Sequence, residues 1–122
     1  MGTVDVRRIN QRRCIPMRAI RNVVARIAAQ FQPERIILFG SYAYGSVRRE
    51  SDVDLLVVMD TPLKETEQAI RICHAVPYHF GLDLIVRKPA TLKRRLALGD
   101  PFLREVVAKG KVLYERADQG VD

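Results

Sequence analysis

The stretch most informative for the fold runs Phe39-Gly40-Ser41-Tyr42-Ala43-Tyr44-Gly45-Ser46-Val47-Arg48-Arg49-Glu50-Ser51-Asp52-Val53-Asp54-Leu55. Its Gly-Ser pair, Gly40 and Ser41, comes directly after the apolar run of residues 35–39. A glycine at a strand end lets the backbone approach a ligand closely, and the serine hydroxyl and the next amides can donate hydrogen bonds to phosphate oxygens. The pair alone is also typical of an ordinary turn, and the stretch lacks the Gly-Lys-Ser/Thr ending of a P-loop. A phosphate-binding role therefore needs support from the residues beyond the pair.

Two acidic residues, Asp52 and Asp54, stand at the start of the next apolar run. The two-residue period of a strand places both carboxylates on one face, with their Cα atoms about 7 Å apart. Their repulsion at that separation is about 2 kcal/mol if the effective dielectric constant is roughly 20. A divalent cation reverses this interaction, and proteins hold Mg²⁺ through a few carboxylates together with substrate phosphates. The spacing therefore predicts a metal site.

A third acid, Asp83, interrupts the apolar run Leu82-Asp83-Leu84-Ile85-Val86. An ionised carboxylate inside a buried strand is costly unless a cation or hydrogen bonds satisfy it. If this strand lies beside the one that begins near Asp54, the three acids form one cluster. The alternative is a structural Asp at a strand end that caps a turn through Gly81.

Short apolar runs bounded by Pro, Gly and polar residues predict four strands, over residues 35–39, 53–59, 82–86 and 111–115. The third, interrupted only by Asp83, has the pattern of a buried strand. The last alternates polar and apolar side chains, which is typical of an edge strand that is wet on one face.

Apolar residues at helical spacing predict a first amphipathic helix that ends before Pro33 and buries Ile20, Val23, Val24, Ile27, Ala28 and Phe31. A second helix is expected to begin with Thr61 and Pro62, to end at Pro77, and to bury Ala69, Ile70, Ile72, Cys73 and Val76. Two short helices come next, one over residues 91–98 and one that begins after Asp100-Pro101. The second is expected to have one apolar face, formed by Phe102, Leu103, Val106 and Val107. The prediction is an α+β fold in which a small mixed sheet is packed with helices.

The composition fits one folded unit. The chain has 122 residues, of which 48% are hydrophobic and 29% are charged, enough for one real core in one domain. We expect a basic N-terminal extension over residues 1–15, a single domain over residues 16–115 and a tail over residues 116–122. No apolar run is long enough to cross a membrane, which predicts a cytoplasmic protein. Cys14 and Cys73 lack zinc spacing, so neither a disulfide framework nor a zinc site is expected and both should be reduced thiols.

The formal net charge is +7, and much of the excess lies early in the chain, at Arg7, Arg8, Arg12, Arg13, Arg18 and Arg21. This balance suits a nucleic acid, a triphosphate substrate or an acidic protein partner equally well, and scattered arginines are commonly just solvated surface. Direct nucleic-acid binding therefore stays open, as does the role of the arginine-rich start.

The joint pattern of Gly40-Ser41, ten intervening residues and Asp52-Val53-Asp54 resembles the signature of the DNA polymerase beta-like nucleotidyltransferase superfamily, and especially its minimal nucleotidyltransferases. The resemblance covers nearly all of residues 16–115, including the closing run from Gly110 to Glu115. It implies the nucleotidyltransferase fold and transfer of a nucleoside monophosphate from a nucleoside triphosphate to an acceptor hydroxyl, with release of pyrophosphate.

The resemblance also implies roles for residues. Gly40, Ser41, Asp52 and Asp54 would bind the nucleotide, and Asp52, Asp54 and Asp83 would be the catalytic acids that hold two Mg²⁺ ions. Asp83 could also take the proton of the acceptor hydroxyl. Minimal nucleotidyltransferases typically occur beside a HEPN-domain toxin and act as the antitoxin by transferring AMP from ATP to that partner.

Two other functions remain open at this point. The chain could neutralise a partner by contact alone, or it could transfer a nucleotide to RNA or to a small molecule such as an aminoglycoside. The three acids disfavour a pure binder, because such a protein has no need to tolerate their repulsion. Tyr42 and Tyr44 could stack on a base or simply pack, and Arg48 and Arg49 could contact phosphate or lie in a solvated loop.

Overall fold

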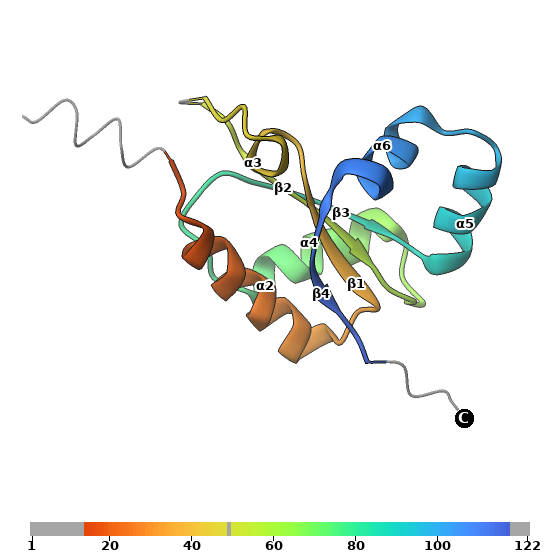
Figure 1. The fold of residues 1–122 in the computed structure, drawn as a ribbon. Coiled ribbons are helices and arrows are strands. Elements are labelled where there is room, and N and C mark those ends of the chain that lie inside the picture. Colours follow the sequence, from red (N-terminus) through yellow and green to blue (C-terminus); the bar gives the residue numbers. More distant parts are fainter. Residues whose placement is uncertain (1–13, 49, 118–122) are drawn as a thin grey trace, which may run out of the picture.

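A computed structural model describes residues 14–48 and 50–117 of the chain (Figure 1). Its elements are, in order, α2 (Met17–Phe31), β1 (Arg35–Phe39), α3 (Ser41–Tyr44), β2 (Val53–Val58), α4 (Glu65–Ala75), β3 (Leu82–Arg87), α5 (Pro89–Ala97), α6 (Pro101–Lys109) and β4 (Lys111–Glu115). The strands form one four-stranded sheet in the order β3-β2-β1-β4. This confirms the predicted α+β fold with a small mixed sheet. No helix of the described segments is long and apolar enough to cross a membrane.

The sheet is mixed because it contains both antiparallel and parallel pairs of strands. β1 pairs antiparallel with β2 and with β4, whereas β3 pairs parallel with β2. A parallel pair needs a crossover connection, and α4 supplies it between β2 and β3. This order places β4 at one edge, as predicted. It also places β3 at the other edge, so the prediction of a fully buried third strand is wrong: Ile85 is half-buried and only Leu84 and Val86 are buried.

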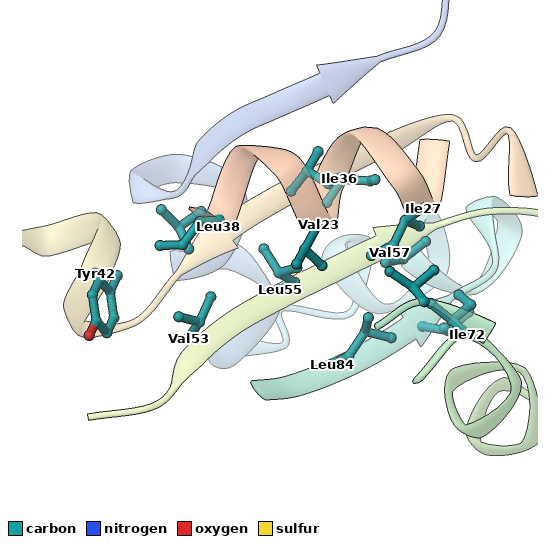
Figure 2. Packing of buried hydrophobic residues seen from close by; sticks show 14 of the residues in the cluster. Val23, Ile27, Ile36, Leu38, Tyr42, Val53, Leu55, Val57, Ile72 and Leu84 are labelled. Carbon is teal, nitrogen blue, oxygen red and sulfur yellow. The ribbon is translucent and has the colours of Figure 1, made fainter. Parts of the chain in front are cut away.

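The two faces of the sheet carry separate apolar clusters. The larger one packs α2 and α4 against one face, where Val23 and Ile27 lie over Leu55 and Val57 (Figure 2). The smaller one packs α5 and α6 against the other face and consists of Ile37, Phe39, Leu56, Val58, Leu92, Leu103 and Val106. Alternate residues of β1 and β2 therefore belong to different cores, as the two-residue period of a strand requires.

The start of α4 differs from the prediction. Thr61 and Pro62 do not open the helix, which begins at Glu65 after Lys64. Thr61 instead fixes the preceding turn: its hydroxyl accepts from the Leu63 N–H at 3.1 Å and donates to Gln68 Oε1 at 2.6 Å. Because this bond satisfies the Gln68 amide oxygen, a polar side chain only 5% exposed can lie in the buried stripe of α4.

Three apolar side chains that were predicted to face the core are exposed. Ile70 is 56% exposed because the buried stripe of α4 passes through Gln68, Ile72 and Val76, four residues apart. Phe102 and Val107 are 46% and 38% exposed, because α6 buries only its Leu103 and Val106. A further difference is that α5 begins at Pro89 rather than at Thr91, with the proline in the first turn, where its missing N–H is tolerated.

The Thr61–Gln68 bond can be tested by substitution. Replacing Thr61 with Val should lower the free energy of unfolding by about 1–3 kcal/mol, because it leaves a buried amide oxygen without its donor. Urea denaturation monitored by circular dichroism measures this loss. Adding Gln68→Leu should recover part of it, since both partners are then apolar. An unchanged midpoint for the single variant would contradict the assignment.

Candidate active site

The candidate site lies in one row across three strands. Phe39 of β1 is the register partner of Asp54 of β2, and Asp54 is the partner of Asp83 of β3. Residues paired in this way share a face of the sheet, and here it is the face covered by α5 and α6, since Phe39 belongs to the smaller core. The next row inward along this face is Ile37, Leu56 and Ile85, which contribute to that core. The two carboxylates therefore emerge where the helical cover ends.

Asp83 is more exposed than predicted. Its side chain is exposed because β3 is an edge strand, so burial does not make it costly. Within the described residues it accepts no hydrogen bond and forms no ion pair, and the Gly81 carbonyl accepts instead from the Val53 N–H at 2.8 Å. The turn-capping alternative therefore finds no support in the structure.

Two glycines lie directly against the carboxylates. A Cβ atom on Gly40 would collide with the carboxylate of Asp54, and a Cβ on Gly81 would collide with that of Asp52. Gly40 also has φ 75°, a left-handed conformation that favours glycine. Asp52 itself is exposed and precedes β2 by one residue. The absence of side chains at positions 40 and 81 thus gives the two carboxylates their space.

The segment after Gly40 is helical, which sequence reasoning missed. Residues 41–44 form the single turn of α3, and Gly45, at φ 86°, ends it by donating to the Ser41 carbonyl at 2.9 Å. The signal was the second glycine, placed where a left-handed helix end favours it. Tyr42 is buried in the larger core and its hydroxyl accepts from the Ile15 N–H at 3.0 Å, so Tyr42 packs, whereas Tyr44 is 40% exposed.

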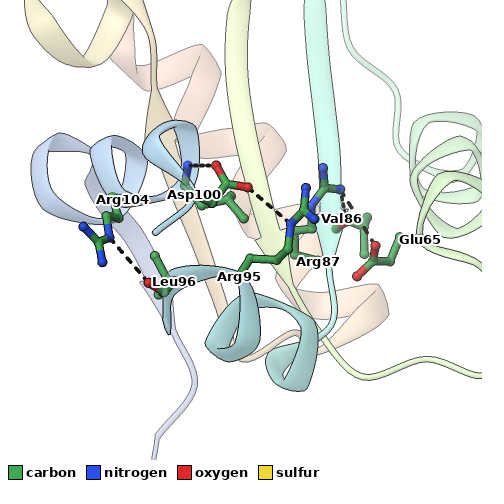
Figure 3. Close-up of polar contacts among 8 residues, drawn as sticks. Glu65, Val86, Arg87, Arg95, Leu96, Asp100 and Arg104 are labelled. Carbon is green, nitrogen blue, oxygen red and sulfur yellow. Dashed lines mark hydrogen bonds and ion pairs between the residues drawn. The ribbon is translucent and has the colours of Figure 1, made fainter. Parts of the chain in front are cut away.

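The acids of the site lack basic partners in the described part of the chain. The ion pairs found there lie elsewhere, and Figure 3 shows two of them, Arg87 with Glu65 and Arg95 with Asp100. Burial, and then the charges of Asp83 and Asp52, raise the pKa of Asp54 to about 6. Asp52 and Asp83 therefore both lie close enough to Asp54 for their charges to act on its carboxyl group.

The side chains as they stand are not a closed metal site. No three His, Cys, Asp or Glu side chains of the described residues converge closely enough to hold an ion. The donor chemistry nevertheless fits Mg²⁺, which takes one or two protein carboxylates and completes its shell with water and substrate phosphates. Gly40, Ser41, Asp52, Asp54 and Asp83 are thus gathered at one end of the sheet.

The other candidates lie apart from this centre or outside the description. Arg48 is exposed and its N–H donates to Ser51 Oγ at 2.8 Å, while Arg49 lies outside the described residues. The arginines before residue 14 also lie outside the described residues, and so does most of the predicted N-terminal extension over residues 1–15. Cys14 and Cys73 are free thiols, as predicted, and burial raises the pKa of Cys73.

A small mixed sheet that gathers carboxylates beside a glycine-serine loop is the arrangement expected of a nucleotidyltransferase. The family model described as "Nucleotidyltransferase domain" matches residues 18–114. The chain therefore belongs to the nucleotidyltransferase domain family and is a nucleotidyltransferase enzyme, which confirms the resemblance seen in the sequence.

Two relatives come from Methanocaldococcus jannaschii and carry the provisional name protein adenylyltransferase. MJ0604 is 31% identical over 101 residues, which cover 80% of this chain and 96% of that protein. MJ0141 is 46% identical over 75 residues, which cover 60% of this chain and 71% of that protein.

Solved structures share the fold. One is a protein of Sulfolobus solfataricus, described provisionally as a nucleotidyltransferase, with a TM-score of 0.60 at 20% identity. The matched region covers 95% of this chain and 93% of the Sulfolobus chain. Another is a toxin-antitoxin structure with AMP-PNP, with a TM-score of 0.53 at 26% identity. The matched region covers 81% of this chain and 75% of the matched chain in that structure.

The two left-handed glycines of the loop offer a matched test. Replacing Gly45, which is in the left-handed helical region, with Ala should destabilise the protein by about 1–2 kcal/mol, and the backbone strain at Gly40, with φ 75° and ψ −159°, should be at least as large. Gly40→Ala should cost clearly more, because its Cβ meets the Asp54 carboxylate whereas a Cβ at Gly45 meets nothing within 4 Å. Urea denaturation of both variants measures the difference. The excess should shrink in an Asp54→Ala background, and equal losses would contradict the packing.

The raised pKa of Asp54 predicts a pH effect on stability without metal. The folded protein binds this proton more tightly than the unfolded chain, whose carboxyl pKa is 3.8. Its contribution is therefore fully present below pH 3.8 and is lost as pH rises to about 6 and beyond. Thermal melts in EDTA should show the stability of Asp54→Asn, relative to wild type, rising between these pH values and then levelling. A pH-independent difference would show that Asp54 titrates normally.

Proposed function

We propose that the chain transfers AMP from ATP to a hydroxyl of a partner protein, in a reaction that requires Mg²⁺. The observation that carries this proposal is the row of Asp54 and Asp83, with Asp52 beside it, next to the Gly40-Ser41 loop in a member of the nucleotidyltransferase domain family. An acid whose pKa is raised by burial and by the charges of neighbouring carboxylates, as that of Asp54 is, is typical of functional sites, including those that hold cations.

Each residue of the site would have its own part in the reaction. Gly40 and Ser41 would hold the triphosphate, with the serine hydroxyl donating to a phosphate oxygen. Asp52 and Asp54 would hold Mg²⁺, and Asp83 would complete the set on the acceptor side. Bound Mg²⁺ would neutralise the phosphate charge and acidify the acceptor hydroxyl.

The reaction makes and breaks one bond to the α-phosphorus of ATP. The acceptor oxygen attacks that phosphorus, its bond to the bridging oxygen of the β-phosphate breaks, and pyrophosphate leaves. The acceptor proton passes to a carboxylate, for which Asp83 is suited because it is exposed on the edge strand, open to an approaching acceptor. The protein then contributes positioning and electrostatics, with no covalent intermediate of its own.

The comparisons support a protein acceptor. MJ0604, named a protein adenylyltransferase, is matched over 96% of its length, so the likeness extends over a whole relative. A neighbouring structure is a toxin-antitoxin that holds AMP-PNP. By analogy, we propose that this chain is an antitoxin that transfers AMP to a HEPN-type toxin. The three neighbouring carboxylates make the contact-only alternative less favourable, because neutralisation by contact requires no such set of acids.

Loss of one carboxylate should abolish this transfer. Asp54→Asn should reduce AMP addition by about a hundredfold or more, because it removes a charge that the transition state needs. The measurement is intact-mass spectrometry of the partner protein that co-purifies with this chain, after incubation with ATP and Mg²⁺. Glu50→Gln is the matched control, since Glu50 is an exposed acid of the same loop outside the row and should retain activity.

Two outcomes would count against the proposal. Near wild-type addition of AMP by Asp54→Asn would show that this acid is not part of the site. A stable complex whose partner never gains mass would indicate neutralisation by contact alone.

A further inference from the structure

A pocket of about 220 Å³ opens beside the candidate site, between α3 and α6. It is lined by Phe39, Gly40, Tyr44, Phe102, Glu105 and Val106. Its floor is formed by two buried apolar side chains, Phe39 and Val106, which are 8% and 1% exposed. Its walls are open, because Tyr44 and Phe102 are 40% and 46% exposed. The fold thus leaves two aromatic side chains at the rim of a small cavity.

The pocket adjoins the carboxylates through shared residues. Gly40 lines it, and a Cβ on the same glycine would collide with the Asp54 carboxylate. Phe39 lines it too and is the register partner of Asp54 on the same face of the sheet. Figure 1 shows α3 and α6 at the same end of β1. A molecule whose phosphates lie at the Gly40-Ser41 loop can therefore extend into this pocket.

The lining suits a flat aromatic ring that carries a hydrogen-bond donor. Phe39 and Phe102 form an edge-to-face pair, with ring centroids 5.5 Å apart and planes at 81°, so Phe102 is held in place although half of it is exposed. The pocket is smaller than the roughly 300–1,000 Å³ of sites for drug-sized ligands. Glu105 is the acid among its lining residues and, when ionised, can only accept hydrogen bonds.

We propose that this pocket seats the base of the nucleotide substrate, with Phe102 and Tyr44 in contact with the ring and Glu105 accepting from an exocyclic amino group. The base of ATP satisfies this requirement, whereas uracil presents a carbonyl oxygen at the corresponding position. The inference rests on the proposed function, because it needs the triphosphate at Gly40 and Ser41. It extends that function to the specificity of the site for the base.

Comparing ATP with inorganic tripolyphosphate separates the base from the phosphates. Calorimetric titration with Mg²⁺ and no acceptor protein should show that wild type binds ATP more tightly than tripolyphosphate. Phe102→Ala should weaken ATP binding by about tenfold, the size of one lost stacking contact, and leave tripolyphosphate binding unchanged. Val107→Ala is the matched control, since it is an exposed apolar residue of the same helix outside the pocket lining and should change neither.

A second variant tests the contact with the amino group. Wild type should bind ATP several-fold more tightly than UTP, and Glu105→Gln should reduce that ratio toward one. Using the ratio removes the general effect of losing a negative charge near an anionic ligand.

Failure of this inference and failure of the proposed function give different results. If ATP and tripolyphosphate bind wild type equally, or Phe102→Ala keeps full ATP affinity, the base lies elsewhere. If Phe102→Ala keeps that affinity but slows AMP transfer to the partner, the pocket holds an acceptor side chain and the inference is overturned. If wild type binds neither ligand, the nucleotide site itself is wrong.

Discussion

The carboxylates gathered at one end of the sheet repel one another, and the apolar core has to offset that repulsion. The parallel pairing of β2 with β3 sets Asp54 directly beside Asp83, and Asp52 adds a third charge one residue before β2. No basic side chain of the described residues pairs with them. The sheet must therefore be held by its apolar contacts, and the neighbours of Asp54 along the chain, Val53 and Leu55, are completely buried. The buried neighbours of Asp54 thus hold its carboxylate at the site despite the repulsion from Asp52 and Asp83.

The sequence indicated most of the fold because its local signals agreed with the tertiary structure. Apolar runs bounded by proline and glycine marked all four strands, and the alternation of residues 111–115 marked an edge strand. The errors arose where tertiary contacts decided. Threonine is a common helix N-cap residue, yet the Thr61 hydroxyl donates a hydrogen bond to Gln68 Oε1 instead of capping α4. Ile70 has the character of a core residue, yet the stripe that packs on β3 passes it by.

The candidate site was predictable to a similar extent. The spacing of Gly40-Ser41 and Asp52-Val53-Asp54 is local, so it was readable, and the register of β2 with β3 then brings Asp83 alongside. The exposure of Asp83 could not be predicted from the sequence, because edge position is a consequence of strand order. The pocket was equally hidden, since its lining comes from β1, α3 and α6, segments that only the folded chain brings together.

One face of the sheet serves as both core and site, and this links stability to function. The inner rows of that face are sealed by Leu103 and Val106 of α6, and the outer row holds Asp54 and Asp83. The helix that seals the core also carries Phe102 and Glu105 at the pocket rim. A change in the packing of α6 must then move the rim relative to the carboxylates, because closely packed interiors transmit such shifts. The position of α6 therefore couples the core of this small domain to the geometry of its site.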